Sequence, residues 1–342
     1  MPPTQSTSSD LDDDDVDDDD VDVDDFAAFV VVVDASAIGG LLEREARCAC
    51  APPGAEARRG NFAFLNVHAC SRATLNENEE EIFEEQWRAK TKGNPKMFNA
   101  SKFRFANASH GASVGDGAYA TKVKVNIALG ITDYKTFMCT NLSREWRSLV
   151  RDEGLGRERC VVVETRAPLE ATTTWDGRYR HLADALGNCV MLHTTDDSFV
   201  LLERSACVGE APGAVVFPGG HAEPSDANVG DEILDVSELM FSSALRECEE
   251  ELGVKSEDVG DLRMLGITRR VVNARSCMVF YAECRLTADE ALAMYPFADD
   301  AYESSRAFAV TSSELMTSSE IACRMPGDHV GAVELLRRFL AR

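Results

Sequence analysis

Polar or small residues alternate with apolar ones in residues 121–129 (TKVKVNIAL), where Val123, Val125, Ile127 and Leu129 fall on one face. This two-residue period predicts a β-strand with one buried side. More continuously apolar runs predict further strands at 26–33 (FAAFVVVV), 62–69, 188–194, 198–205 and 277–286, and 214–221 (AVVFPGGH) predicts a strand that runs into a glycine loop. The turn-forming residues TDDS separate two of these runs, so we expect 188–194 and 198–205 to form a hairpin.

Four segments have the features of helices. Residues 76–93 are acidic in the first turns and basic near the end, an order of charges that suits the helix dipole. Residues 236–252 are followed by Gly253, a typical C-cap residue. We expect further helices within 143–154 and 331–342, the second of which is amphipathic.

The charge of the chain is concentrated at its beginning. The 342 residues carry a net charge of −24, and the twelve aspartates of residues 10–25 account for half of it. Such a block repels itself and cannot bury a core, so we interpret residues 1–25 as a disordered acidic tail. The alternatives are an interaction tail or a weak cation sponge. An acidic chain without a basic stripe argues against nucleic-acid binding.

The length of the chain and a change in its pattern of strand-like and helix-like runs predict two domains after the tail. Residues 26–178 mix strand-like and helix-like runs, and we expect an α/β N-terminal domain there. From residue 179 to 342 the predicted hairpin, a glycine loop and two amphipathic helices suggest a second α/β domain.

The N-terminus and the cysteines bear on the cellular compartment. The apolar run 26–33 ends at Asp34 and is too short for a bilayer, which needs about 20 residues. No basic residue precedes the first acids, which is untypical of a secretory signal. Eleven cysteines without CxxC spacing indicate a reduced chain. We therefore expect a cytoplasmic protein, with the nucleus as a second compartment, and no membrane partner.

The predicted helix 236–252 ends in an unusual acid cluster, RECEEELGV (246–254). Glu247, Glu250 and Glu251 stand at i, i+3 and i+4, so they share one face of a helix. Like charges at this spacing repel each other, and Arg246 is a single neighbouring cation that points about 100° away. A divalent cation with a preference for oxygen ligands, such as Mg²⁺, would neutralise them.

This stretch resembles the signature of the Nudix hydrolases. Arg246 to Val254 fits the pattern R-E-U-x-E-E-x-G-U, where U is a bulky apolar residue, and Glu238 lies eight residues before Arg246 where the signature has its first glutamate. FPGGH supplies the glycine loop, which ends at Gly220. The family has five residues between that glycine and the first glutamate, and here there are seventeen. The resemblance implies a Nudix α/β/α sandwich with a mixed sheet, preceded by the α/β N-terminal domain.

The resemblance also implies roles for individual residues. Glu247, Glu250 and Glu251 would be Mg²⁺ ligands together with the Gly220 carbonyl, and Mn²⁺ would be a substitute ion. Arg246 and Glu238 would support the helix and its ligands. The implied reaction is hydrolysis of a nucleoside diphosphate linked to another group, and which glutamate takes the proton of the attacking water stays open.

Upstream segments narrow the expected substrate. MFNASKFRF (97–105) and GITDYKTFMCTN (130–141), with SFVLLERS and EAPGAVVFPGGHAEP, resemble the eukaryotic UDP-glucose/UDP-galactose diphosphatase branch. The resemblance runs from about residue 82 to 340. It implies cleavage of a UDP-sugar to UMP and a sugar 1-phosphate. The alternatives are a diphosphatase for ADP-ribose, NADH, coenzyme A or capped RNA, or a non-catalytic module that binds a UDP-sugar. Oligomeric state and the choice between glucose and galactose stay open.

Six residues are candidates for substrate contacts, and each has a structural alternative. The candidates are Arg104, Tyr134, Thr140, Asn141, Arg204 and His221. A guanidinium fork suits phosphate oxygens, but Arg104 could equally form an interdomain salt bridge. An aromatic residue at helical spacing from other apolar residues, such as Tyr134, is more often part of a core. Thr140 and Asn141 are also good helix-cap residues.

Overall fold

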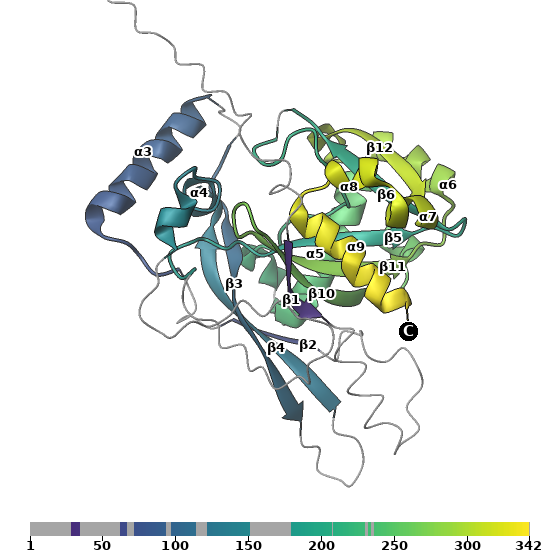
Figure 1. Cartoon of the computed structure of the whole chain (residues 1–342), viewed down its shortest axis with the longest axis horizontal. Helices are drawn as coiled ribbons and strands as arrows, with labels where there is room; N and C mark the ends of the chain where they lie inside the picture. Colours follow the sequence, from purple (N-terminus) through teal and green to yellow (C-terminus); the bar gives the residue numbers. More distant parts are fainter. Residues whose placement is uncertain are drawn as a thin grey trace, which may run out of the picture.

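The computed structural model describes residues 29–34, 62–66, 72–93, 97–113, 122–150, 179–206, 208–229, 232–233 and 236–341 (Figure 1). The predicted acidic tail, residues 1–25, lies outside this part of the chain. The helices are α3 (Glu77–Gly93), α4 (Tyr134–Cys139), α5 (Val236–Leu252), α6 (Ala288–Met294), α7 (Ser312–Thr317), α8 (Ser319–Cys323) and α9 (Gly327–Leu340).

The strands form a large mixed sheet, a smaller three-stranded sheet and a two-stranded ribbon. Their bounds are β1 (Phe29–Asp34), β2 (Phe62–Asn66), β3 (Ser101–Ser113), β4 (Lys122–Asp133), β5 (Gly187–His193), β6 (Ser198–Arg204), β7 (Val215–Val216), β8 (Asn228–Val229), β9 (Glu232–Ile233), β10 (Arg263–Arg270), β11 (Ser276–Glu283) and β12 (Ser304–Thr311). The large sheet has the order β1-β10-β11-β5-β6-β12, with β7 paired to β6. Strands β5 and β11 are parallel, and β5 and β6 form the predicted antiparallel hairpin.

Alternate residues of the large sheet face two different helices. In β5, Val190 and Leu192 belong to the core cluster that includes α5, while Cys189 and Met191 belong to the cluster that includes α9. Successive side chains of a strand point to opposite faces, so one strand serves both layers. The C-terminal half is therefore the predicted α/β/α arrangement, with α9 crossing one face of the sheet (Figure 1).

The three-stranded sheet β2-β4-β3 adds a further layer beyond α5. Phe103, Phe105, Ile127 and Leu129 from this sheet lie in the same core cluster as the buried residues of α5. The N-terminal sheet and the Nudix-like half thus share one core in the described residues, although the boundary at residue 178 itself remains a prediction. Helix α5 is covered on both sides, which makes it the central helix of the fold.

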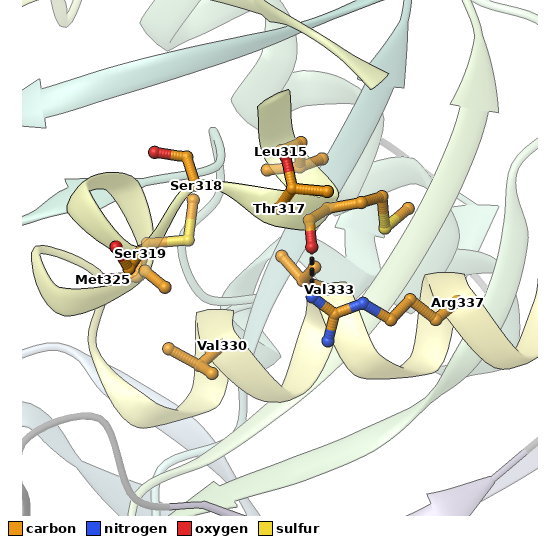
Figure 2. Close-up of a pocket in the computed structure, with 10 residues that line it drawn as sticks. Leu315, Thr317, Ser318, Ser319, Met325, Val330, Val333 and Arg337 are labelled. Atoms are coloured by element: carbon orange, nitrogen blue, oxygen red, sulfur yellow. Dashed lines mark hydrogen bonds between the residues drawn. The ribbon is translucent and has the colours of Figure 1, made fainter. Parts of the chain in front are cut away.

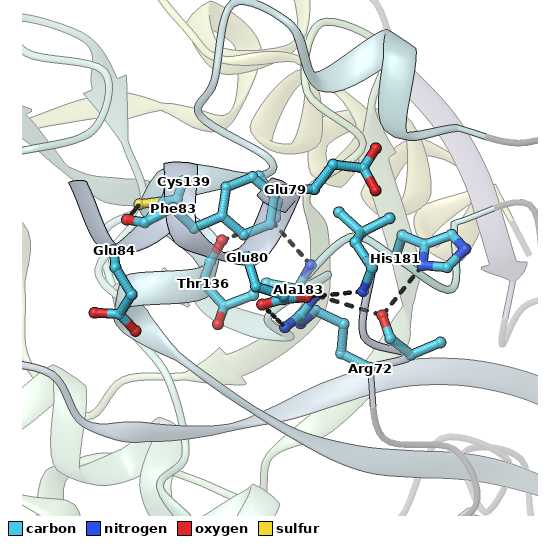
Figure 3. A network of polar contacts seen from close by, with 12 residues as sticks. Arg72, Glu79, Glu80, Phe83, Glu84, Thr136, Cys139, His181 and Ala183 are labelled. Atoms are coloured by element: carbon cyan, nitrogen blue, oxygen red, sulfur yellow. Dashed lines mark hydrogen bonds and ion pairs between the residues drawn. The ribbon is translucent and has the colours of Figure 1, made fainter. Parts of the chain in front are cut away.

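Polar contacts fasten α3 and α4 to the segment that leads into β5 (Figure 3). Both Nη atoms of Arg72 donate to the Glu80 carboxylate over 2.8 Å. The Cys139 thiol donates to the Phe83 carbonyl over 3.4 Å, and His181 Nδ1 lies 3.2 Å from the Ala73 oxygen. These contacts hold the helical part of the N-terminal half against residues 179–183.

Most predicted elements are confirmed, with three corrections. Strand β1 was assigned to the N-terminal domain, but it pairs with β10 in the large sheet. The helix expected within 143–154 is only a short 3₁₀ helix, Trp146–Leu149, and residues 151–154 lie outside the described residues. The closing helix begins at Gly327, four residues earlier than expected. Among the described helices, none combines the length and the apolar character that crossing a bilayer would need.

Candidate active site

Helix α5 carries the acid cluster at its C-terminal end and stops abruptly after it. Gly253 has φ +74°, and its N–H donates to the Glu249 carbonyl over 2.8 Å. The left-handed conformation favours glycine, so Gly253 is the predicted C-cap. Cys248 and Leu252 face the core, while Glu249 pairs with Lys255 Nζ at 2.7 Å near the surface.

The glycine turn after β7 packs directly against the glutamates. The Gly219 N–H donates to Glu251 Oε2 over 2.7 Å. A Cβ atom on Gly220 would lie 2.3 Å from Glu247 Oε1, so only glycine allows the carboxylate to lie there. Asn188 holds the turn from β5, because its N–H donates to the Gly220 carbonyl over 2.8 Å and its Oδ1 accepts from the Gly220 N–H. The distant FPGGH and RECEEELGV segments therefore meet in space.

Two of the three glutamates are held in an environment that disfavours their ionised form. Burial, and then the charge of Glu250, raise the pKa of Glu247 to about 7. Burial, and then the charge of Glu247, raise the pKa of Glu251 well above its usual range. Glu251 is only 6% exposed. None of the described basic side chains forms an ion pair with either carboxylate.

This donor set fits a hard divalent cation. Glu247 and Glu251 offer carboxylate oxygens beside the Gly220 carbonyl, which has a second lone pair beyond the bond from Asn188. Within the described residues no three acidic, histidine or cysteine side chains are gathered into a preformed metal cluster. Glu250 is turned aside, with Oε1 3.5 Å from Arg246 Nε. The roles of all four residues as metal ligands remain predictions.

Arg246 ties α5 to the segment between the glycine turn and this helix, and its supporting role stays a prediction. Its Nη2 donates to Asp226 Oδ2 over 2.7 Å, which ties α5 to the 3₁₀ helix Pro224–Ala227 in the inserted segment. Glu238 is an exposed residue in the first turn of α5. Its supporting role is not tested by the geometry.

Three of the six candidate substrate residues lie around the acid site and have polar atoms without hydrogen-bond partners among the described residues. Arg204 uses Nε to donate to the Glu210 carbonyl, and in the described structure its two Nη atoms have no hydrogen-bond partner. Its charge acts on Tyr134, Glu251 and His221. The phenol oxygen of Tyr134 has no partner among the described residues. His221 Nε2 is buried without a partner, and the His221 backbone bonds to the Glu247 carboxylate.

The other three candidates are occupied by structural hydrogen bonds. Arg104 is 3% exposed and donates to the carbonyls of Tyr179 and Leu182. Thr140 Oγ1 donates to the Thr136 carbonyl over 2.6 Å, and Asn141 is fully buried at the junction between α4 and the large sheet. These environments favour the structural alternatives, and a substrate contact by these residues stays a prediction.

One acidic residue of this site was not singled out from the sequence. Glu303, in the 3₁₀ helix Ala301–Glu303, contributes to the raised pKa of both Glu247 and Glu251. It lies 49 residues after the signature in a turn that has no distinctive pattern, so nothing local indicates it.

Two cavities lie elsewhere in the described structure, away from the acid cluster of α5. A cavity of about 230 Å³ lies between α7, α8 and α9, lined by apolar side chains and a few hydroxyl groups (Figure 2). Arg337 closes one side of it, because its Nη2 donates to the Met316 carbonyl over 2.6 Å. A second, of about 290 Å³, adjoins β12 and α8.

Two curated proteins are similar to this chain over about three quarters of its length. No protein-family model matches the sequence. Nudix hydrolase 9 of Arabidopsis thaliana is 32% identical over 277 residues, which are 77% of this chain and 81% of that protein. The Homo sapiens uridine diphosphate glucose pyrophosphatase NUDT22 is 31% identical over 264 residues, 74% of this chain and 79% of that protein. A solved Nudix hydrolase from Nitrosomonas europaea aligns with 46% of this chain and 88% of its own at 17% identity, with a TM-score of only 0.30. The coverage and identity of the Arabidopsis relative show that this chain is a hydrolase and belongs to the Nudix hydrolase family.

Proposed function

We propose that this Nudix hydrolase cleaves the diphosphate of UDP-glucose or UDP-galactose to give UMP and a sugar 1-phosphate. The carrying observation is an arrangement in which Glu251 interacts electrostatically both with Glu247 and with Arg204, whose Nη atoms have no hydrogen-bond partner in the described structure. It offers oxygen ligands for a cation on one side and donors for phosphate oxygens on the other. The curated relatives named uridine diphosphate glucose pyrophosphatase support the choice of substrate.

The residues that would hold Mg²⁺ are Glu247, Glu250 and Glu251 with the Gly220 carbonyl, and Mn²⁺ would be a substitute. When bound, the ion neutralises diphosphate charge and makes a bound water more acidic. Glu250 would have to leave Arg246, an exposed pair that costs little to separate.

The side chains around the acid site would bind and orient the substrate. The open fork of Arg204 fits two oxygens of one phosphate group. The Tyr134 hydroxyl, which has no hydrogen-bond partner in the described structure, can donate to another oxygen atom of the substrate. His221 is half-buried, and its buried Nε2 has no partner among the described residues, a costly arrangement that a polar group of the substrate would relieve.

A substrate panel tests this proposal. The purified full-length protein would be incubated with UDP-glucose, UDP-galactose, ADP-ribose, NADH and coenzyme A, with and without Mg²⁺, and the products separated by chromatography. We expect UMP from the UDP-sugars only, and only with Mg²⁺. Intact UDP-sugars beside cleaved ADP-ribose, NADH or coenzyme A would leave the family chemistry in place and refute the proposed substrate.

The variant Glu251→Gln distinguishes an enzyme from a non-catalytic UDP-sugar-binding module. Glutamine keeps an oxygen that can accept from the Gly219 N–H, so the fold should be retained. We expect turnover to fall about 100-fold or more because one anionic ligand is lost. The Kd of UDP should change by no more than a few-fold. Equal UDP-sugar binding by both proteins with no turnover by either would favour the binding module.

We expect the substrate partner to be a small nucleotide sugar and the site of action to be the cytoplasm, with the nucleus as a second compartment. The net charge of −24 opposes binding to nucleic acid, including capped RNA.

A further inference from the structure

A tightly bonded loop between α6 and β12 packs against α5. The Tyr295 hydroxyl donates to the carbonyls of Ala301 and Ser304 over 3.0 and 2.9 Å. The Asp300 N–H donates to the Glu250 carbonyl over 2.7 Å, so the loop is fixed to the acidic end of α5. Positions 295–304 are thus held in place on rigid elements, as a recognition site requires.

Glu303 and Arg204 both act electrostatically on Glu251 but do not pair with each other. The Ser205 N–H donates to the Glu303 carbonyl over 2.9 Å, which brings the two residues to neighbouring backbone positions. Each charge acts on the pKa of Glu251, and Arg204 acts on that of Glu303. No hydrogen bond or ion pair to the Glu303 carboxylate is formed by any of the described residues. Two opposite, partly buried charges that do not pair leave donors and acceptors for a ligand.

Tyr302 precedes Glu303 and is 69% exposed, a large value for an aromatic side chain on a fixed loop. The carboxylates of Asp300 and Glu303 lie near its hydroxyl, since after burial they raise the pKa of the Tyr302 phenol. An exposed ring beside an open carboxylate offers a flat apolar face next to a hydrogen-bond acceptor.

We propose that Tyr302 and Glu303 form the hexose subsite: Glu303 accepts hydrogen bonds from sugar hydroxyls, and Tyr302 packs against the C–H face of the pyranose ring. This inference rests on the proposed UDP-sugar substrate. A carboxylate only accepts hydrogen bonds and repels phosphates, so it suits a ligand rich in hydroxyl donors. The aromatic face is electron-rich and attracts the C–H groups of a ring lying over it. The hexose is joined directly to the diphosphate, which matches a subsite beside Glu247 and Glu251.

The test compares a ligand with the hexose and one without it. The KM for UDP-glucose and the competitive Ki of UDP would be measured for the full-length wild type, Tyr302→Ala, Tyr302→Phe and Glu303→Gln at saturating Mg²⁺. We expect Tyr302→Ala and Glu303→Gln each to raise KM about tenfold, the effect of one lost contact of about 1.4 kcal/mol, and to leave the Ki of UDP within about twofold. Tyr302→Phe keeps the ring and should retain the wild-type KM.

Three results would overturn the subsite. An equal rise in KM and in the Ki of UDP would place the loop against the nucleotide instead of the hexose. A higher Mg²⁺ concentration for half-maximal rate in Glu303→Gln, with KM unchanged, would make Glu303 a metal ligand. Unchanged KM in both variants would show that the loop does not contact the sugar. Thermal unfolding of each variant checks folding, and wild-type cleavage of UDP-glucose separates failure of this inference from failure of the proposed function.

Discussion

At the scale of single residues, the acid cluster shows how burial and charge combine. The helical spacing of the glutamates indicates one shared face, but the tertiary structure divides them. Glu251 is buried and bonded to the Gly219 N–H, Glu247 lies against Gly220, and Glu250 remains beside Arg246. Spacing on a helix is local, whereas burial depends on what packs against it. The sequence thus predicts the set of acids but not their different environments.

The raised pKa of Glu247 makes stability depend on pH. Its pKa is about 7 in the folded protein, against an ordinary value of 4.5. Between these values the folded protein keeps a proton that the unfolded chain has lost, so stability falls as pH rises. Without divalent ions, we expect the wild-type Tm to fall more between about pH 5 and about pH 8 than that of Glu247→Gln, which cannot ionise.

The surface variant Glu249→Gln is the control for this comparison. It removes an exposed glutamate that pairs with Lys255, so its Tm should follow pH as the wild type does. Identical pH dependence in the wild type and Glu247→Gln would contradict the raised pKa.

At the scale of elements, the end of α5 depends on one backbone conformation. Gly253 has φ +74°, and a Cβ atom there would lie 2.8 Å from the Met294 carbonyl oxygen. Alanine would be strained in this conformation and would also push against the loop after α6. We expect Gly253→Ala to lower the free energy of unfolding by about 2 kcal/mol in urea titrations. Gly93→Ala is the matched control, because a Cβ at the end of α3 meets nothing within 4 Å.

The junction between α4 and the large sheet depends on Asn141. Its Nδ2 donates to the Asn273 carbonyl over 2.8 Å, and its Oδ1 accepts from the Asp184 N–H over 2.9 Å. Asn141→Ala leaves two buried backbone groups without partners, so we expect a loss of about 3 kcal/mol in unfolding free energy and an unchanged KM. The control Asn99→Ala removes an exposed bond to the Lys135 N–H. A raised KM with wild-type stability would instead support the predicted substrate contact.

At the scale of the whole molecule, the two halves depend on one core. Phe103 and Phe105 of the N-terminal sheet lie in the same cluster as Met240 and Phe241 of α5. Residues 179–342 alone would expose that surface to water. We expect this fragment to aggregate or to unfold without a cooperative transition, measured by gel filtration and circular dichroism. A monomeric fragment with a sharp thermal transition would show that the C-terminal half is an independent domain.

Prediction from sequence succeeds here where the signal is local. The bounds of α5 and the β5–β6 hairpin follow from periodicity and turn residues. Strands β10 and β12 were not predicted, because their pairing partners lie far away in sequence and their residues have no clean alternation. The short apolar run in β1 predicts a strand, but only long-range pairing decides that it joins β10.

By itself the sequence determined the acid cluster, the glycine turn and the C-cap of helix α5, because residue spacing along one chain controls each of them. Only the tertiary structure decided which polar side-chain atoms remain available for hydrogen bonds to a ligand. Arg204, Tyr134 and His221 keep polar atoms without hydrogen-bond partners among the described residues, whereas Thr140 and Asn141 form hydrogen bonds to the backbone. Whether a side chain bonds to the protein or stays open depends on neighbours that are distant in sequence, and such neighbours are brought together by folding.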